Sequence, residues 1–132
     1  KLRWAAAPLK PSTIATTRIA EHWAHALDIA VPLGIDYPDT DRLRHIAWLG
    51  YTTLPYAFGL DGLEPQPVFV ELTAPSGATW TFGEPSAPNH ISGSASEFCR
   101  IGARRLAPDD STIVATGPYS AQTLCVLRNY AA

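Results

Sequence analysis

The chain has 132 residues and a net charge of −2, with 46% hydrophobic and 17% charged residues. This composition excludes a disordered tail, because enough apolar side chains are present to bury a core. The slightly acidic balance argues against a nucleic-acid partner or an anionic membrane surface, and no apolar run reaches the ~18 residues of a transmembrane helix. Two cysteines, Cys99 and Cys125, make no disulfide framework and favour a reducing cytoplasm.

The sequence contains no methionine and starts at Lys1 without a signal peptide. We therefore expect the chain to be the C-terminal part of a longer polypeptide. On this interpretation, some residues of any active site lie upstream of Lys1.

The first predicted helix covers residues 13–31, with Ser12 as its N-cap and residues 32–34 as its end. One face is apolar and is expected to need cover from helices outside this chain, or from a second chain. A second face is polar. The apolar face carries Ile19, Ala20, Trp23, Leu27 and Ala30, and the polar face carries Arg18, Glu21, His25 and Asp28.

A second helix is predicted from Asp41 to about Leu54, capped by Asp39 or Thr40, and Pro55 perturbs its end before a loop at 59–67. Alternating apolar residues then predict strands at 68–73 and 78–82, joined by a tight turn. A short strand at 90–92 is expected to follow.

The capping pair Ser94 and Glu97 predicts a third helix. A strand at 112–116 and a last helix from Tyr119 to about Tyr130 complete the chain. The fold class is therefore α+β: one helix attached to a small α+β unit, with a seam near residues 32–40.

Glu21 and His25 are one helical turn apart, so a carboxylate oxygen and an imidazole nitrogen can reach the same metal ion. Zinc accepts both ligand types at about 2.0–2.2 Å, but it needs at least a third ligand. Asp28, one turn beyond His25, suits a partner for the other imidazole nitrogen. The alternative, which spacing alone leaves open, is an ordinary solvent-exposed pair.

The remaining candidates have structural interpretations. Cys99 and Cys125 are expected to be small buried hydrophobic residues rather than nucleophiles. His45 and His90 are expected on the surface. The 104–105 arginine pair suits the negative end of the third helix, with anion or substrate binding as the alternative.

The sequence of residues 18–30, within the first predicted helix, resembles the last helix of the N-terminal bundle in the mycothiol-dependent maleylpyruvate isomerase family. The members of this family are actinobacterial DinB-like metal-binding proteins. The pattern R-x-x-E-x-W-x-H-x-x-D is matched at Arg18, Glu21, Trp23, His25 and Asp28. Looser similarity continues through residues 40–47, 70–83 and 98–105, and it covers the chain from about Pro11 to Tyr130.

The resemblance implies that residues 1–34 supply the last helix of a DinB-like four-helix bundle, and that residues 35–132 form a sterol-carrier-like α+β domain. It implies that Glu21 and His25 bind a divalent metal, with zinc the expected ion, together with a histidine from an early bundle helix. Arg104 matches a family arginine near the active site, although Ala103 replaces the usual preceding glycine and a second arginine follows.

The activity implied is a cytoplasmic isomerase or S-transferase that uses mycothiol on a small electrophile. A bound metal favours the thiolate form of a thiol at neutral pH. The expected partners are the small-molecule electrophile and either the upstream bundle segment or a second chain, which includes a homo-oligomer. No nucleic acid and no membrane are expected.

The sequence is also compatible with two other functions. The first is a non-catalytic module that binds a lipid or small molecule in a pocket lined by aromatic residues, which are Trp48, Tyr51, Phe58, Phe69, Trp80 and Phe82. The second is a role in tRNA wyosine modification, which similar C-terminal segments suggest and which the lack of a basic stripe disfavours.

Overall fold

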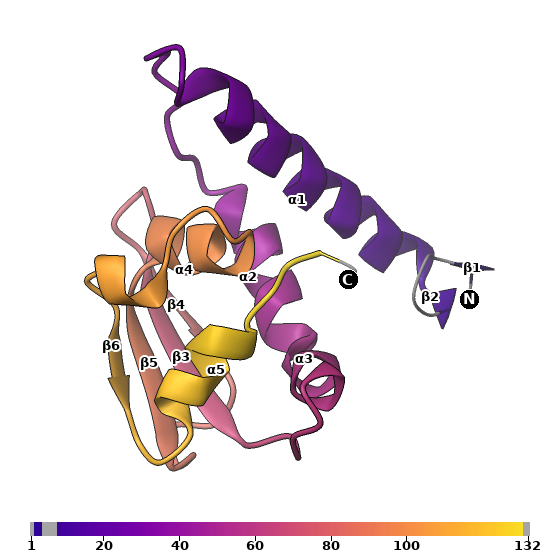
Figure 1. The fold of residues 1–132 in the computed structure, drawn as a ribbon, viewed down its shortest axis with the longest axis vertical. Helices are drawn as coiled ribbons and strands as arrows, with labels where there is room; N and C mark the ends of the chain where they lie inside the picture. Colours follow the sequence, from indigo (N-terminus) through magenta and orange to yellow (C-terminus); the bar gives the residue numbers. More distant parts are fainter. Residues whose placement is uncertain (1, 4–7, 131–132) are drawn as a thin grey trace.

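The computed structural model describes residues 2–3 and 8–130, and it has mixed α and β structure (Figure 1). The α+β class predicted from sequence is confirmed. The helices are α1 (Pro11–Ala30), α2 (Leu43–Thr52), α3 (Leu54–Leu60), α4 (Ala95–Gly102), the 3-10 turn η1 (Pro108–Asp110) and α5 (Ser120–Val126). The strands are β1 (Leu2–Arg3), β2 (Pro8–Leu9), β3 (Val68–Thr73), β4 (Thr79–Phe82), β5 (Asn89–Ser94) and β6 (Val114–Thr116).

Strands β3 to β6 form a sheet in the order β4-β3-β5-β6. Strand β3 is antiparallel to β4 and parallel to β5, and β6 is antiparallel to β5. Apolar side chains of β3, such as Val70 and Leu72, are fully buried, whereas Glu71 between them is exposed. The sheet therefore has one face covered by helices and one open face, and the strands predicted at 68–73, 78–82 and 90–92 are confirmed with small changes in their ends.

Helix α1 begins one residue before the predicted N-cap. Pro11 occupies the first helical turn, and Lys10 is the cap residue without a side-chain hydrogen bond. Ser12 as the N-cap was therefore wrong, because proline with its fixed φ and missing N–H is well suited to the first position. The predicted end is confirmed: Gly34 takes a left-handed φ of 64°, and the Ile35 amide bonds back to the Ala30 carbonyl at 2.9 Å.

The apolar face of α1 is covered by this chain itself. Ala20, Trp23, Leu27 and Ala30 are buried, and α1 packs against α2. Figure 1 shows α1 lying along the helical side of the α+β unit. The expectation that these residues need helices from elsewhere was wrong, because α2 packs on this face and the four residues are buried within the chain. Ile19, at the margin of the stripe, remains partly exposed.

The predicted second helix is two helices. Helix α2 ends at Thr52, and α3 starts at Leu54 with Pro55 in its first turn. Pro55 therefore begins a new helix instead of only disturbing the end of the previous one. The predicted cap at Asp39 or Thr40 was wrong, because α2 starts two residues later with Arg42 as its N-cap and without a side-chain capping bond. The Thr40 hydroxyl accepts a 3.4 Å hydrogen bond from the Arg42 amide in the turn before the helix.

Half of the predicted capping box forms at α4. The Ser94 hydroxyl accepts from the Glu97 amide at 3.1 Å, as expected. The Glu97 carboxylate does not return to Ser94. It accepts instead from the backbone amide and hydroxyl of Thr112, at 3.0 and 2.9 Å, which ties α4 to the segment before β6.

The last helix is shorter than predicted. Helix α5 ends at Val126, and Leu127 is extended with φ −50° and ψ 130°. The chain then turns back toward the middle of α1 (Figure 1). Asn129 holds it there: its backbone amide bonds to Gly102 and its side-chain amide to the Cys99 carbonyl, both at 3.0 Å.

The two cysteines differ. Cys99 is buried as predicted, and its thiol donates to the Leu43 carbonyl at 3.6 Å. Burial also raises the pKa of the Cys99 thiol far above its ordinary value, which keeps the thiol protonated and unreactive. Cys125 is exposed, so its predicted burial was wrong, because it falls on the solvent side of the short α5. His45 is exposed as predicted, whereas His90 is half-buried against Phe69.

The division of the chain at residues 34 and 35 stays a prediction. Residues 1 and 4–7 of the first predicted part, and residues 131–132 of the second, lie outside the described residues. Among the helices that the structure describes, none is long and apolar enough to cross a membrane.

Candidate metal and substrate site

A pocket of about 310 Å³ lies between α1, the end of α4 and the segment that follows α5. Glu21 and His25 both line it, so the structure brings the two predicted ligands to one cavity. The small side chains of Ala20 and Ala24 leave space beside them on α1. The lining residues are Ala20, Glu21, Ala24, His25, Ala103, Arg105, Asn129 and Tyr130.

Glu21 and His25 face the pocket from consecutive turns of α1. The side chains are 37% and 74% exposed, respectively, so both are accessible to a ligand. Arg18, one turn earlier, contacts Oε2 of Glu21 at 3.3 Å. The contact engages one carboxylate oxygen and leaves the other available.

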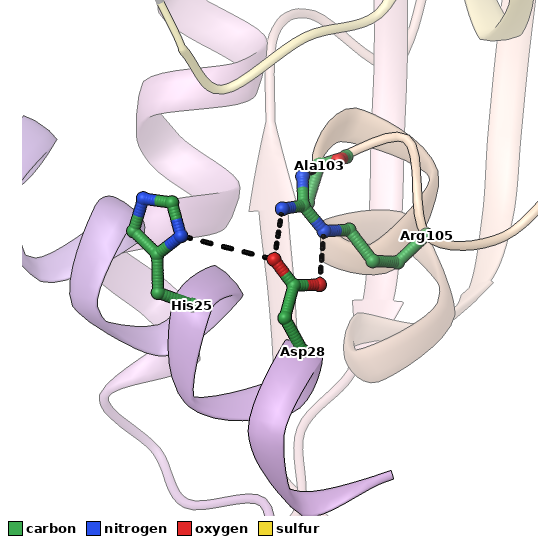
Figure 2. Close-up of polar contacts among 4 residues, drawn as sticks. All are labelled: His25, Asp28, Ala103 and Arg105. Carbon is green, nitrogen blue, oxygen red and sulfur yellow. Dashed lines mark hydrogen bonds and ion pairs between the residues drawn. The ribbon is translucent and has the colours of Figure 1, made fainter. Parts of the chain in front are cut away.

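Asp28 connects His25 with α4 (Figure 2). Its Oδ2 lies 3.7 Å from Nδ1 of His25, which is an ion-pair distance rather than a hydrogen bond. The same carboxylate accepts two hydrogen bonds from Arg105, at 3.0 Å from Nε and 2.6 Å from Nη2. Arg105 also donates to the Ala103 carbonyl. The bidentate pair therefore joins α1 to the end of α4 at the edge of the pocket.

The pair shifts the ionisation of both partners. Hydrogen bonds from Arg105 lower the pKa of Asp28 below its ordinary value of 3.8, and the positive charges of Arg105 and His25 act in the same direction, against a smaller effect of burial. The bonds to Asp28 raise the pKa of Arg105. Asp28 is therefore ionised at neutral pH, as a carboxylate that orients an imidazole must be.

Replacing Arg105 by alanine is expected to raise the pKa of Asp28 back toward 3.8, because the carboxylate loses its two strongest hydrogen bonds. Since the folded-state pKa is depressed, the pair stabilises the fold above pH 3.8, and that contribution fades as the pH falls through the lower folded value. Titration of the Asp28 carboxyl by NMR in both proteins checks this. An unchanged Asp28 pKa in the variant would show that the pair does not form in solution.

Arg104 does not line the pocket. It is exposed, follows the C-cap of α4, and has a left-handed φ of 62°. The Arg105 amide bonds back to the Arg100 carbonyl at 2.9 Å, so the turn resembles the helix ending in which glycine usually takes the left-handed position. The neighbouring Arg105 occupies the pocket edge. The sequence shows two adjacent arginines, and only the left-handed turn decides which one points to α1.

Arg104→Gly is expected to stabilise the fold by about 0.5–1 kcal/mol, because glycine adopts the left-handed conformation without the strain of a side chain. The free energy of unfolding in urea measures the change, and Arg100→Gly, inside α4, is the matched control that should lose stability. A destabilised Arg104→Gly protein would mean that the Arg104 side chain contributes contacts worth more than the backbone strain.

The donor set fits a metal ion only in part. Carboxylate and imidazole are both zinc ligands, and Asp28 stands where an outer partner of His25 is needed. Within residues 2–3 and 8–130, no group of three or more histidine, cysteine, aspartate or glutamate side chains is placed to hold a metal. A metal bound at Glu21 and His25 would need a third ligand from residues beyond those described or from a second chain.

The aromatic residues considered for a lipid pocket are mainly core residues. Phe58 and Trp80 are buried, and Tyr51 stacks on Phe82 with ring centroids 5.7 Å apart. None of the six aromatic side chains lines the 310 Å³ pocket or the 460 Å³ pocket on the other side of α1. Phe58 and Trp80 therefore stabilise the interior, Trp48 is exposed, and the six residues give no support to a lipid site.

Two curated proteins are similar to this chain: uncharacterized proteins of Mycobacterium tuberculosis from strains CDC 1551 / Oshkosh and ATCC 25618 / H37Rv. Each is 40% identical over 133 residues, which cover 99% of this chain and 52% of the relative. The chain thus spans about half the length of the curated relatives it matches. No family model and no solved structure matches the chain.

Proposed function

We propose that this chain contributes half of the active site of a metal-dependent enzyme that uses a low-molecular-weight thiol, of the mycothiol type, on a small electrophile. One observation carries the proposal: Glu21, His25 and Arg105 line the same pocket, so two metal-binding groups and a cation meet there. In a longer polypeptide of the relatives' size, the third metal ligand would come from the remaining half.

In this proposal Glu21 and His25 hold a divalent metal, with zinc the best match to their chemistry. When bound, such an ion lowers the pKa of a coordinated thiol and so supplies a thiolate at neutral pH. Asp28 faces Nδ1 of His25 at 3.7 Å, which leaves Nε2 for the metal, and a small approach of the two side chains would form the hydrogen bond that fixes the tautomer. Arg18 orients the Glu21 carboxylate.

Arg105 is placed to bind an acidic group of the substrate. A guanidinium has five N–H donors, of which three are used on Asp28 and Ala103. The two that remain can bind a carboxylate at the pocket edge, and Asp28 keeps the guanidinium in place. Arg104, which the resemblance suggested for this role, lies outside the pocket lining.

The family and fold assignments belong to this proposal. The chain would combine the last helix of a DinB-like bundle, within residues 1–34, with a sterol-carrier-like domain at 35–132. Support comes from the match of Arg18, Glu21, Trp23, His25 and Asp28 to the family pattern, and from relatives in an actinobacterium. Addition of the thiolate followed by elimination would give isomerisation, whereas a retained thioether would give S-transfer.

The test is a thiol-dependent assay on the longest polypeptide that the gene encodes. Maleylpyruvate reports isomerisation and monochlorobimane reports S-transfer, each measured with and without mycothiol and with a metal chelator. We expect turnover that requires both the thiol and the metal, and that falls about 10–100-fold in Arg105→Ala for an acidic substrate, as for other lost charged contacts. Turnover that is unchanged by chelator would exclude the proposed chemistry.

A further inference from the structure

A second pocket, of about 460 Å³, lies on the other side of α1. One wall is formed by Ile19, His22 and Trp23 of α1. The other is formed by residues between 37 and 46, which include the start of α2. Adjacent helical residues point about 100° apart, so His22 faces away from the Glu21 side. The two pockets share no lining residue, and the second therefore is separate from the proposed metal site.

Two residues that line this second pocket carry buried polar atoms without a hydrogen bond. These atoms are Nε1 of Trp23 and Oδ1 of Asp39, and neither has a partner among the residues that the structure describes. Trp23 is only 7% exposed. The nearest ion-pair contact of Asp39 Oδ1 is Nη2 of Arg100 at 3.7 Å, which is too long for a hydrogen bond. Buried polar groups are nearly always paired in folded proteins, so a donor and an acceptor at one pocket need an explanation.

The rest of the pocket indicates what kind of molecule would pair with them. Ile19, Leu43 and Ile46 contribute apolar walls, and Tyr37 adds an aromatic ring at the edge. Small-molecule sites commonly combine such walls with a few polar groups, in volumes of about 300–1,000 Å³. Arg100 forms an ion pair with Asp39 at 3.7 Å, and Arg42 adds a second positive charge to the pocket lining, which favours an uncharged ligand over an amine.

We propose that this second pocket binds a small uncharged organic molecule with an apolar ring or chain and one hydroxyl or primary amide group. The ligand accepts a hydrogen bond from the Trp23 indole and donates one to Asp39. Both protein atoms are covered in this conformation, so the side chains at the pocket wall shift when the ligand reaches them. Binding therefore changes the environment of the Trp23 indole N–H and does not require a metal.

The experiment uses benzamide as the probe, because it joins an aromatic ring to a group that both donates and accepts. In ¹⁵N NMR spectra of the whole chain, the indole N–H signal of Trp23 is identified by its loss in Trp23→Phe. We expect that signal to shift progressively with millimolar benzamide. Trp48→Phe, an exposed tryptophan of α2 outside the pocket, and His25→Ala, in the other pocket, are controls that leave the shift unchanged.

Variants measure each half of the interaction. Trp23→Phe should weaken benzamide binding about fivefold, the effect of losing one neutral hydrogen bond. Asp39→Leu should weaken it by about tenfold or more, because a hydrogen bond to a carboxylate is stronger. Ile19→Trp, at a partly exposed position, should fill the pocket and abolish binding without disturbing the core. Ethylbenzene, which has the ring but no polar group, should bind at least about fivefold more weakly than benzamide.

Three results would overturn the proposal: no shift of the Trp23 signal, equal binding of ethylbenzene and benzamide, or binding to Ile19→Trp as tight as to the parent chain. If Trp23→Phe fails to fold, the ethylbenzene comparison and Ile19→Trp still decide the question.

Discussion

His25→Ala is expected to weaken zinc binding by the longest encoded polypeptide by more than about 100-fold. Loss of an outer-shell partner alone costs about 10–100-fold in affinity, and the imidazole is a direct ligand in the proposed site. Competition titration with a coloured zinc chelator measures the affinities. Glu21→Ala should lose affinity in the same way.

The matched control is His22→Ala, on the same helix. His22 is exposed like His25, but it lies on another side of α1 and lines the other pocket. Its removal should leave zinc affinity unchanged. Equal losses from His22→Ala and His25→Ala would mean that the ion binds histidines nonspecifically, and the proposed site would be wrong.

Phe98→Ala is expected to lower the free energy of unfolding by about 3–5 kcal/mol. Phe98 is 1% exposed on α4, within the core formed by the helices and the buried face of the sheet. A Cβ atom added at Gly50 of α2 would lie 3.6 Å from the Phe98 ring, so the two helices pack closely there. The neighbouring residues therefore have little freedom to fill the cavity that Phe98→Ala leaves. Urea unfolding followed by circular dichroism measures the loss.

Phe69→Ala is the control for Phe98→Ala, because it removes the same ring from the open face of β3, where the side chain is half-buried beside His90. We expect at most about half the loss at Phe69, in proportion to the smaller apolar area removed from solvent contact. Similar losses at both positions would show that the open face of the sheet is covered in solution.

The strands were predictable because their side chains alternate. Val68, Val70 and Leu72 are buried, and Glu71 between them is exposed, so a period of two identified β3 directly. The parallel pairing of β3 with β5 was not predictable, since the same alternation fits either direction. Helix α3 was missed because Pro55 was taken as an end, and proline occurs both after helices and in their first turns.

The covering of α1 depends on contacts far apart in the sequence. Periodicity identified Trp23 and Leu27 as a buried face, and the structure confirms that they are buried. Periodicity does not say which surface covers them. The missing upstream bundle helices were the expected cover, whereas the linker at 32–40 lets α2 fold back on α1.

Part of the candidate site was also readable from the sequence. The i, i+4 spacing of Glu21 and His25 placed them on one face, and the structure places both in one pocket. Asp28 was recognised as a partner of His25. Arg105 was overlooked in favour of Arg104, because the left-handed turn after α4 sets the direction of both side chains and leaves no clear sequence signal when glycine is absent.

The metal itself is the most direct test. The longest encoded polypeptide, purified without chelating agents or an affinity tag that binds metals, should be analysed for its elemental content beside its Glu21→Ala and His25→Ala variants. The proposal predicts a divalent ion, with zinc favoured, in equal amount to the protein chain and lost from both variants. A parent protein free of metal, or variants that retain the full amount, would contradict it.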